Sequence, residues 1–368
     1  MEGLEVSLPG NLFGGSYQGR SVFVTGHTGF KGSWLALWLE QMGAVVHGFA
    51  LDPATQPNHW DKLALASDEI RGDIREASVL RTALKVAQPD IVFHLAAQPL
   101  VRRSYRDPLE TWSTNVMGTA NLLEACRHTP GVRAIVVVTT DKCYQNQEWD
   151  WGYRESDALG GHDPYSASKA GAELVAASYR SAFFNEPDAP LMATARAGNV
   201  IGGGDWSEDR LIPDLVRAIE AGVPLEVRSP RSTRPWQHVL ESLSGYLILG
   251  QKLLAGEQAF AQSWNFGPPA EGNRCVADVL QGLAEHWPAL TWQDASTTGP
   301  HEARLLYLDS SKARSRLDWH PVWSFDDMLM ATADWYRQCA LDGTVATREQ
   351  LAAYVNAARG AGLSWASS

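Results

Sequence analysis

The chain has 368 residues, of which 45% are hydrophobic and 20% charged, with a formal net charge of -11 at pH 7. This balance is typical of a soluble globular protein and excludes a disordered or fibrous class. No apolar run reaches the roughly 18 residues of a membrane span, and the acidic charge disfavours binding to nucleic-acid phosphates. The first residues lack the features of a secretory signal, so we expect a cytoplasmic protein. The four cysteines form no C-x-x-C pair, which predicts reduced thiols and no metal site.

Short β-branched segments alternate with longer amphipathic segments through the first half of the chain. Strands are expected at residues 21–25, 44–51, 69–72, 91–95, 134–140 and 191–197. Helices are expected at residues 29–42, 77–87, 108–127 and 165–184. Because strands that alternate with helices form parallel sheets covered on both faces, we predict an α/β fold with a Rossmann-type doubly wound sheet.

The regularity declines after residue 200, although helices are expected at residues 239–254 and 324–339. We predict an N-terminal extension over residues 1–18 and an NAD-binding Rossmann domain over 19–200. Residues 201–368 are predicted to form mainly a smaller mixed α/β substrate-binding lobe, with some segments returning to the first domain. Ligands of open α/β folds bind at the carboxyl edge of the sheet, so the lobe is expected there.

A glycine motif follows the first predicted strand and opens the first predicted helix. Gly26, Gly29 and Gly32 form G-x-x-G-x-x-G. Glycines let the backbone turn tightly and approach a pyrophosphate, while the helix N-terminus offers free N–H groups to the phosphates. We assign these glycines, with Thr28 and Phe30 between them, to a dinucleotide site; the alternative is a tight turn without a ligand.

Acidic residues close the next two predicted strands. Asp52 lies 20 residues after Gly32, where a carboxylate accepts hydrogen bonds from the adenosine ribose and repels a 2′-phosphate, so NAD is expected rather than NADP. Asp73 and Ile74 are placed to meet the adenine. The alternative for Asp52 is a simple turn residue before Pro53, and the alternative for Asp73 and Ile74 is an ordinary strand end.

Small residues end the fourth predicted strand in the segment HLAAQ, residues 94–98. They permit close approach of a dinucleotide, so we assign Leu95, Ala96 and Ala97 to the cofactor site. Gln98 is assigned to the substrate site, and His94 to a structural role.

Tyr165 and Lys169 lie one turn apart on one face of a predicted helix. A nearby ammonium favours the phenolate, so Tyr165 is a candidate base that takes the proton of a sugar hydroxyl. Lys169 is also expected to hold the nicotinamide ribose. Thr139 and Thr140 end the fifth predicted strand beside them. We assign Thr139 to the cofactor and Thr140 to the substrate hydroxyl; the alternatives are an exposed Tyr–Lys pair and a capping threonine.

The glycine motif, Asp52, HLAAQ, Asn115, TTDKCY and YSASK together resemble the extended short-chain dehydrogenase/reductase family, over nearly the whole chain. The Thr140–Asp141 pair followed by Tyr144 is similar to the sugar-nucleotide 4,6-dehydratases more than to the 4-epimerases. Within them, the segments at 26–35, 139–144, 195–206, 234–239 and 300–303 are similar to the CDP-glucose subgroup.

This resemblance implies a lyase of deoxysugar biosynthesis that converts CDP-glucose to CDP-4-keto-6-deoxyglucose. NAD takes the hydride from C4 while Tyr165 removes the hydroxyl proton, water leaves across C5 and C6, and the hydride returns to C6. Asp141 is the implied acid for the C6 hydroxyl. Lys142 stands where the broader dehydratases carry the presumed C5 base, a Glu, and the CDP-glucose subgroup shares Asp-Lys. The identity of the C5 base stays open, with an exposed loop lysine as the alternative.

The resemblance also implies that Asn199, Arg234 and Arg304 bind the substrate diphosphate, and that helices 108–127 and 165–184 assemble a homodimer or homotetramer. The alternative for the two arginines is solvation at the surface, and the alternative for the two helices is that they are plain surface helices. Two rival functions remain: another sugar-nucleotide dehydratase or 4-epimerase, which product mass separates, and a non-catalytic NAD-binding sensor. A sensor has no need of the Thr140, Tyr165 and Lys169 set.

Overall fold

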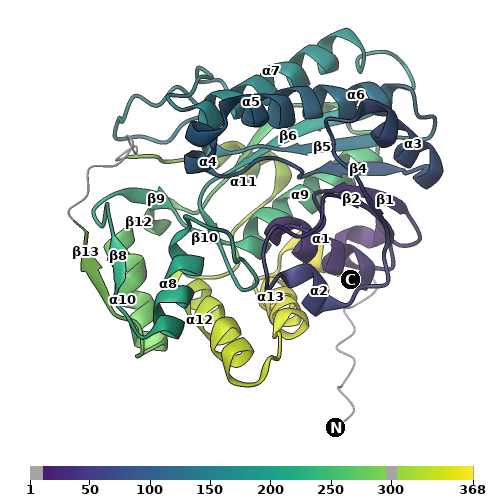
Figure 1. Ribbon diagram of the computed structural model, residues 1–368. Helices are drawn as coiled ribbons and strands as arrows, with labels where there is room; N and C mark the ends of the chain where they lie inside the picture. The colour runs from purple at the N-terminus through teal and green to yellow at the C-terminus, as the bar shows by residue number, and fades with distance from the viewer. Residues whose placement is uncertain (1–10, 296–304, 368) are drawn as a thin grey trace.

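A seven-stranded parallel sheet forms the centre of the computed structural model, which describes residues 11–295 and 305–367 (Figure 1). The strands follow the order β11-β6-β5-β4-β1-β2-β3. Their bounds are β1 Ser21–Thr25, β2 Val45–Ala50, β3 Asp68–Arg71, β4 Ile91–His94, β5 Ala134–Val138, β6 Leu191–Ala197 and β11 Ser263–Phe266. The predicted doubly wound α/β fold is confirmed.

Helices cover both faces of the sheet because successive side chains of each strand point to opposite sides. Phe23 of β1 packs into a core with α3 (Ala77–Ala87), α6 (Gly118–Arg127) and α7 (Pro164–Ala182). Val22 and Val24 pack into a larger core on the other face, with α1 (Phe30–Gln41) and α9 (Val239–Leu254). The two helical layers lie above and below the sheet in Figure 1.

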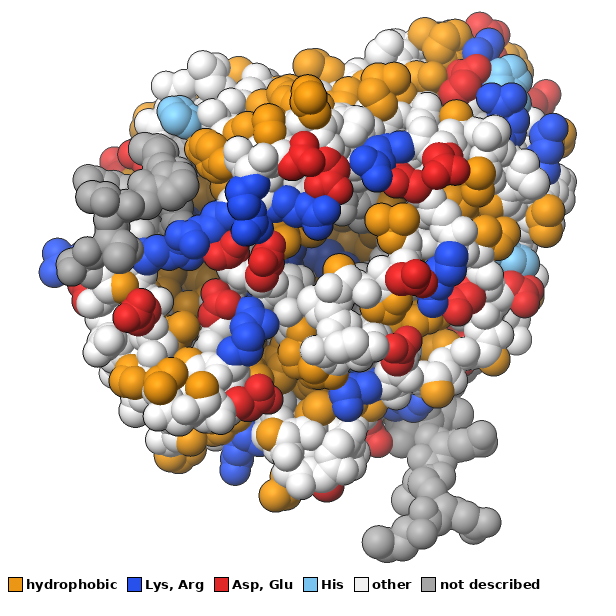
Figure 2. All heavy atoms as spheres, in the orientation of Figure 1, with side chains coloured by type: hydrophobic (Ala, Val, Ile, Leu, Met, Phe, Trp, Pro, Cys, Tyr) orange, Lys and Arg blue, Asp and Glu red, His pale blue; other side chains and the backbone are white. Residues whose placement is uncertain are grey.

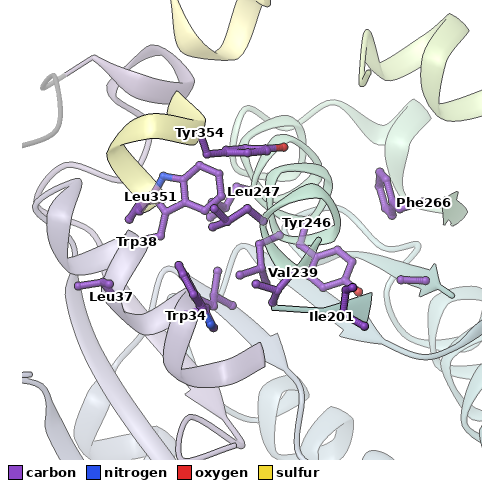
Figure 3. Close-up of a cluster of buried hydrophobic side chains, with 14 of the residues drawn as sticks. Trp34, Leu37, Trp38, Ile201, Val239, Tyr246, Leu247, Phe266, Leu351 and Tyr354 are labelled. Carbon is purple, nitrogen blue, oxygen red and sulfur yellow. The ribbon is translucent and has the colours of Figure 1, made fainter. Parts of the chain in front are cut away.

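The larger core is rich in aromatic side chains and joins segments far apart in the sequence. Trp34 and Trp38 of α1 lie beside Leu247 of α9 and Tyr354 of α13 (Thr347–Gly360), as Figure 3 shows. Phe13, in the short helix η1 (Leu12–Gly15), stacks on Trp365 in η6 (Ser364–Ala366), with ring centroids 5.0 Å apart. Segments near both ends of the described chain therefore pack into one core.

The second half of the chain contributes to two regions. Strand β11 extends the main sheet beside β6, and helix α11 (Ser311–Leu317) packs against β11. Apart from α9 and α13, most of the remaining segments form short two-stranded pairs and helices beside the sheet's carboxyl edge. The pairs are β7 (Val200–Ile201) with β10 (Gln237–His238), β8 (Leu225–Val227) with β13 (Trp292–Asp294), and β9 (Thr233–Pro235) with β12 (Asn273–Cys275); the helices are α8 (Leu211–Ala221), α10 (Val276–His286) and α12 (Phe325–Asp342).

The helix predicted over residues 108–127 is divided into three parts. Helix α5 (Pro108–Trp112) passes into a π-helical turn, η2 (Ser113–Met117), before α6 begins. Asn115 lies in this wide turn. Its side-chain oxygen accepts from the backbone N–H of Gln98 at 2.8 Å, and its side-chain nitrogen donates to the Gln98 carbonyl at 3.0 Å. The turn therefore fastens the helix to the segment that follows β4.

Several short helices complete the fold. They are α2 (His59–Leu63), α4 (Val101–Arg106), η3 (Asp141–Cys143), η4 (Gln258–Phe260) and η5 (Ala270–Gly272). Within residues 11–295 and 305–367, no helix combines the length and apolar character that crossing a membrane requires.

Candidate active site

A cleft of about 2080 Å³ runs along the carboxyl ends of the parallel strands. The turn after β1 and helix α4 line one side, and the start of α8 and strand β9 line the other. Figure 2 shows basic and acidic side chains side by side across this face. Several arginines of the cleft are paired with acidic neighbours, among them Arg102 with Asp209 and Arg210 with Asp205.

Every predicted site residue that the structure describes lines this one cleft. From the cofactor set these are Gly26, Thr28, Gly29, Phe30, Gly32, Asp52, Asp73, Ile74, Leu95, Ala96, Ala97 and Thr139. From the catalytic and substrate sets they are Gln98, Thr140, Asp141, Lys142, Tyr165, Lys169, Asn199 and Arg234. Arg304 lies outside the described residues. The fold thus brings together motifs that are far apart in the sequence, while the role of each residue stays a prediction.

The glycine turn has two kinds of glycine. Gly26 has a φ of +75°, and a Cβ there would lie 2.7 Å from the backbone nitrogen of Ala96. Gly29 caps α1 with φ of -81°, and a Cβ there would meet only the Gly26 carbonyl, at 3.4 Å. Packing within the protein therefore requires glycine at position 26 and not at 29. The open side of Gly29 faces the cleft, which fits a pyrophosphate against the helix N-terminus.

The acidic residues after β2 and β3 differ in their environment. The side chain of Asp52 is 87% exposed and pairs with Arg71 at 3.3 Å, so its carboxylate is accessible to a ribose. Asp73 accepts hydrogen bonds from the guanidinium and backbone N–H of Arg75, and these hold its pKa below the usual value. Ile74 is buried and packs against Gly118 at the start of α6.

Tyr165 and Lys169 stand in the first turns of α7, where Asp163 caps the helix by accepting from the Ser166 N–H at 2.9 Å. Burial raises the pKa of Tyr165 to about 12, opposed by the charge of Arg210 and a hydrogen bond with Thr140. Burial also lowers the pKa of Lys169 to about 8. Desolvation thus disfavours each charged form taken alone.

Asp141 lies beside this pair with one oxygen uncommitted. Its Oδ1 accepts from the Thr140 hydroxyl at 2.8 Å. Its Oδ2 is buried and has no hydrogen-bond partner among the described residues. A Cβ at Gly198 would lie 3.1 Å from that oxygen and would clash with Pro235, so both residues border the space beside it. Buried carboxylate oxygens normally have partners, so Oδ2 is a candidate contact for a ligand in the cleft that Asp141 lines.

Some predicted residues are already engaged inside the protein. The side-chain amide nitrogen of Gln98 donates to the Leu100 carbonyl and to the Thr111 hydroxyl, and its amide oxygen accepts from the Leu100 N–H. The Gln98 side chain therefore shapes the loop after β4. The Thr139 hydroxyl donates to Glu173. His94 hydrogen-bonds Thr25 of β1 and Thr119 of α6, as its predicted structural role requires.

Two cleft residues were missed by the sequence analysis. Lys31 of α1 donates to the Tyr246 hydroxyl at 3.3 Å, and burial lowers the pKa of Lys31 to about 7. Arg210, just before α8, pairs with Asp205 at 3.2 Å and lines the cleft near Tyr165. Lys31 lies inside the glycine motif, which was a usable signal. Nothing local marks Arg210, because only the fold brings residue 210 to the cleft.

A glycine turn at the N-terminus of α1, a Tyr–Lys pair on the long helix α7 and a threonine beside the pair define the site of a short-chain dehydrogenase/reductase. The sequence comparisons agree. The family described as GDP-mannose 4,6 dehydratase matches residues 23–332, and the chain belongs to this family.

Individual relatives and solved structures are more specific than the family model. The CDP-glucose 4,6-dehydratase of Salmonella typhimurium is 47% identical over 350 residues, covering 93% of this chain and 98% of that protein. The structure of DesIV, a dTDP-glucose 4,6-dehydratase from Streptomyces venezuelae with NAD bound, matches with a TM-score of 0.72 and 27% identity, covering 86% and 97% of the two chains. The epimerase Mth375 of Methanothermobacter thermautotrophicus, at 24% identity and a TM-score of 0.78 over 89% and 94% of the chains, shares the fold.

The two glycines give a paired prediction. Gly29→Ala should change the free energy of unfolding by less than about 1 kcal/mol and weaken NAD binding at least about tenfold, because the methyl group enters the cleft. Gly26→Ala should instead lower the free energy of unfolding by more than about 2 kcal/mol, because alanine is strained at positive φ and its methyl group meets the Ala96 backbone. Denaturant unfolding and calorimetric titration with NAD measure both. Tight NAD binding by a stable Gly29→Ala protein would contradict the assignment.

Proposed function

We propose that this protein is an NAD-dependent lyase that dehydrates CDP-glucose to CDP-4-keto-6-deoxyglucose. The 47% identity to a CDP-glucose 4,6-dehydratase, nearly end to end, supports the substrate. The single structural observation that carries the reaction type is the uncommitted Oδ2 of Asp141 beside Tyr165 and Lys169. An oxidation alone requires the Tyr–Lys pair, whereas loss of water also requires an acid for the departing hydroxyl.

The turn at Gly29 would hold NAD, which would supply the hydride acceptor for C4 and the hydride donor for C6. Tyr165 takes the proton of the C4 hydroxyl, and the ammonium of Lys169 stabilises the phenolate that this role needs. Thr140 holds the same hydroxyl in line. Asp141 then protonates the leaving C6 hydroxyl through its Oδ2.

Lys142 is our proposed base for the C5 proton, since it lines the cleft in the residue after Asp141. The 4-keto group formed in the first step acidifies C5–H, so a neutral amine can take this proton, and a proton is returned to C5 when C6 receives the hydride. Asn199 and Arg234 line the same cleft, where an amide and a guanidinium bind the diphosphate.

The substrate assignment predicts a narrow nucleotide preference. The pure protein with added NAD, incubated separately with CDP-, dTDP-, UDP- and GDP-sugars, should turn over CDP-glucose and give a product lighter by one water, as mass spectrometry would show. An unchanged mass with an altered sugar would indicate an epimerase. Efficient dehydration of dTDP-glucose in preference to CDP-glucose would contradict the finer assignment.

The role of Tyr165 predicts a separable defect. Tyr165→Phe should fold and retain NAD, because the ring stays in place, yet lose about 10²- to 10⁴-fold in turnover of CDP-glucose. Stopped-flow absorbance of reduced cofactor and steady-state rates measure the loss. Turnover near the native rate would exclude the phenol as the base.

We also propose that two copies pair through the outer face of α5, η2 and α7. This face exposes four large apolar side chains, Leu109 (80%), Trp112 (41%), Met117 (56%) and Leu174 (61%). Helix α7 packs directly against α5 and η2, so these side chains share one surface, and Figure 2 shows apolar groups gathered over it. A contiguous apolar patch on paired helices fits a self-complementary four-helix contact between two identical copies.

Charge placed on this face should separate the copies. Leu109→Glu combined with Leu174→Glu should give a monomer by light scattering, whereas the native protein should be a dimer or tetramer. Leu341→Glu is the matched control, since Leu341 is 85% exposed on α12, away from this face. An unchanged assembly in the double variant would contradict the proposed interface.

A further inference from the structure

A buried ion pair lies directly behind the Tyr165–Lys169 pair. Glu173 of α7 and Arg196 of β6 are joined at 2.7 Å, and their side chains are only 1% and 3% exposed. Glu173 follows Lys169 by one helical turn, so both side chains leave the same face of α7. Charged groups this deeply buried are costly unless each is paired and hydrogen-bonded. This pair therefore demands an explanation beyond packing.

Glu173 holds the start of the catalytic loop. Its carboxylate accepts hydrogen bonds from the hydroxyls of Thr139 and Thr194, the latter at 2.8 Å. Thr139 is the first residue after β5 and directly precedes Thr140 and Asp141. The carboxylate thus fixes the point at which the loop leaves the sheet.

Arg196 holds the other end of the same loop. Its guanidinium donates to the Tyr144 hydroxyl at 2.8 Å and lies over the Tyr144 ring. The Tyr144 hydroxyl in turn donates to Asn265 Oδ1 at 2.7 Å. Residues 139 and 144 bracket Thr140, Asp141 and Lys142, so the one ion pair clamps both ends of the segment that carries them.

Glu173 also supplies a negative charge next to Lys169. Burial lowers the pKa of Lys169, and the charge of Glu173 opposes this most. Tyr165 lies one helical turn away on the other side of Lys169, and the charge of Lys169 also lowers the pKa of Lys31 and His94. Although burial acts against ionisation of Glu173, Arg196 and the two threonines hold its pKa below the usual value, so the negative charge persists.

We infer that Glu173 is a positioning residue of the reaction: clamped by Arg196, its carboxylate fixes the loop of residues 140–142 and places a negative charge one helical turn from Lys169. Glu173 is not among the described residues that line the cleft. This inference rests on the proposed dehydratase function, because Lys169 must be protonated to stabilise the Tyr165 phenolate.

The test is the pH profile of CDP-glucose dehydration by the NAD-loaded enzyme. Glu173→Gln removes the negative charge one helical turn from Lys169, so Lys169 should release its proton at lower pH. The alkaline limb of kcat should then move toward acid by about one pH unit, with about a tenfold lower rate on that limb and little change in KM. Thr194→Val is the matched control, since it removes a hydrogen bond to Glu173 and keeps the charge. Its alkaline limb should stay in place.

A second variant covers loss of folding, because Glu173→Gln leaves Arg196 buried without its partner. Glu173→Gln combined with Arg196→Met removes both charges, and it should also move the alkaline limb of kcat toward lower pH. A native profile in a folded Glu173 variant, or an equal shift in Thr194→Val, would overturn the inference. If the native enzyme itself fails to dehydrate CDP-glucose, the proposed function falls instead, so the two failures are distinguishable.

Discussion

Exclusion of water from the Tyr165–Lys169 pair is the constraint on which the site depends. Burial raises the pKa of Tyr165 to about 12 and lowers the pKa of Lys169 to about 8, so an isolated phenolate and an isolated ammonium are both disfavoured in the cleft. Opposite charges one helical turn apart stabilise each other more strongly where water is absent. In the proposed reaction, the Lys169 ammonium therefore stabilises the Tyr165 phenolate.

The fold meets this constraint by converging several strand ends on one helix. Strand β5 delivers Thr139 and Thr140, and β6 delivers Arg196 behind them. The cap at Asp163 fixes where α7 begins, which sets the direction of the Tyr165 side chain. On the opposite side, the open surface of Gly29 leaves space for a dinucleotide. Buried hydrogen bonds behind the cleft thus hold the groups that face it.

Local sequence patterns predicted most of the sheet and the cleft-lining residues, because strand ends and the glycine motif are encoded by adjacent residues. Strand β11 was not predicted: it has four residues, 66 residues after the end of β6, and only its pairing with β6 identifies it. The π-turn in the helix over 108–127 was also missed. It depends on Asn115 bonding the Gln98 backbone, a contact that helical periodicity does not encode.

The same reasoning explains which site features required coordinates. Tyr165 and Lys169 are four residues apart and visible as a motif, whereas Glu173 and Arg196 meet across 23 residues and two elements. The sequence motif identified Asp141, but only the structure shows that its Oδ2 has no partner among the described residues. Long-range hydrogen bonds and exact side-chain burial are properties of the packed chain, and short patterns do not carry them.

The transfer of hydrogen from C4 to C6 within one sugar tests the account most directly. CDP-glucose carrying deuterium at C4 would be converted by the NAD-loaded protein, and the product examined by mass spectrometry and proton NMR. We predict a product lighter by one water with the deuterium on the C6 methyl group. Deuterium retained at C4, or lost to solvent, would contradict the mechanism.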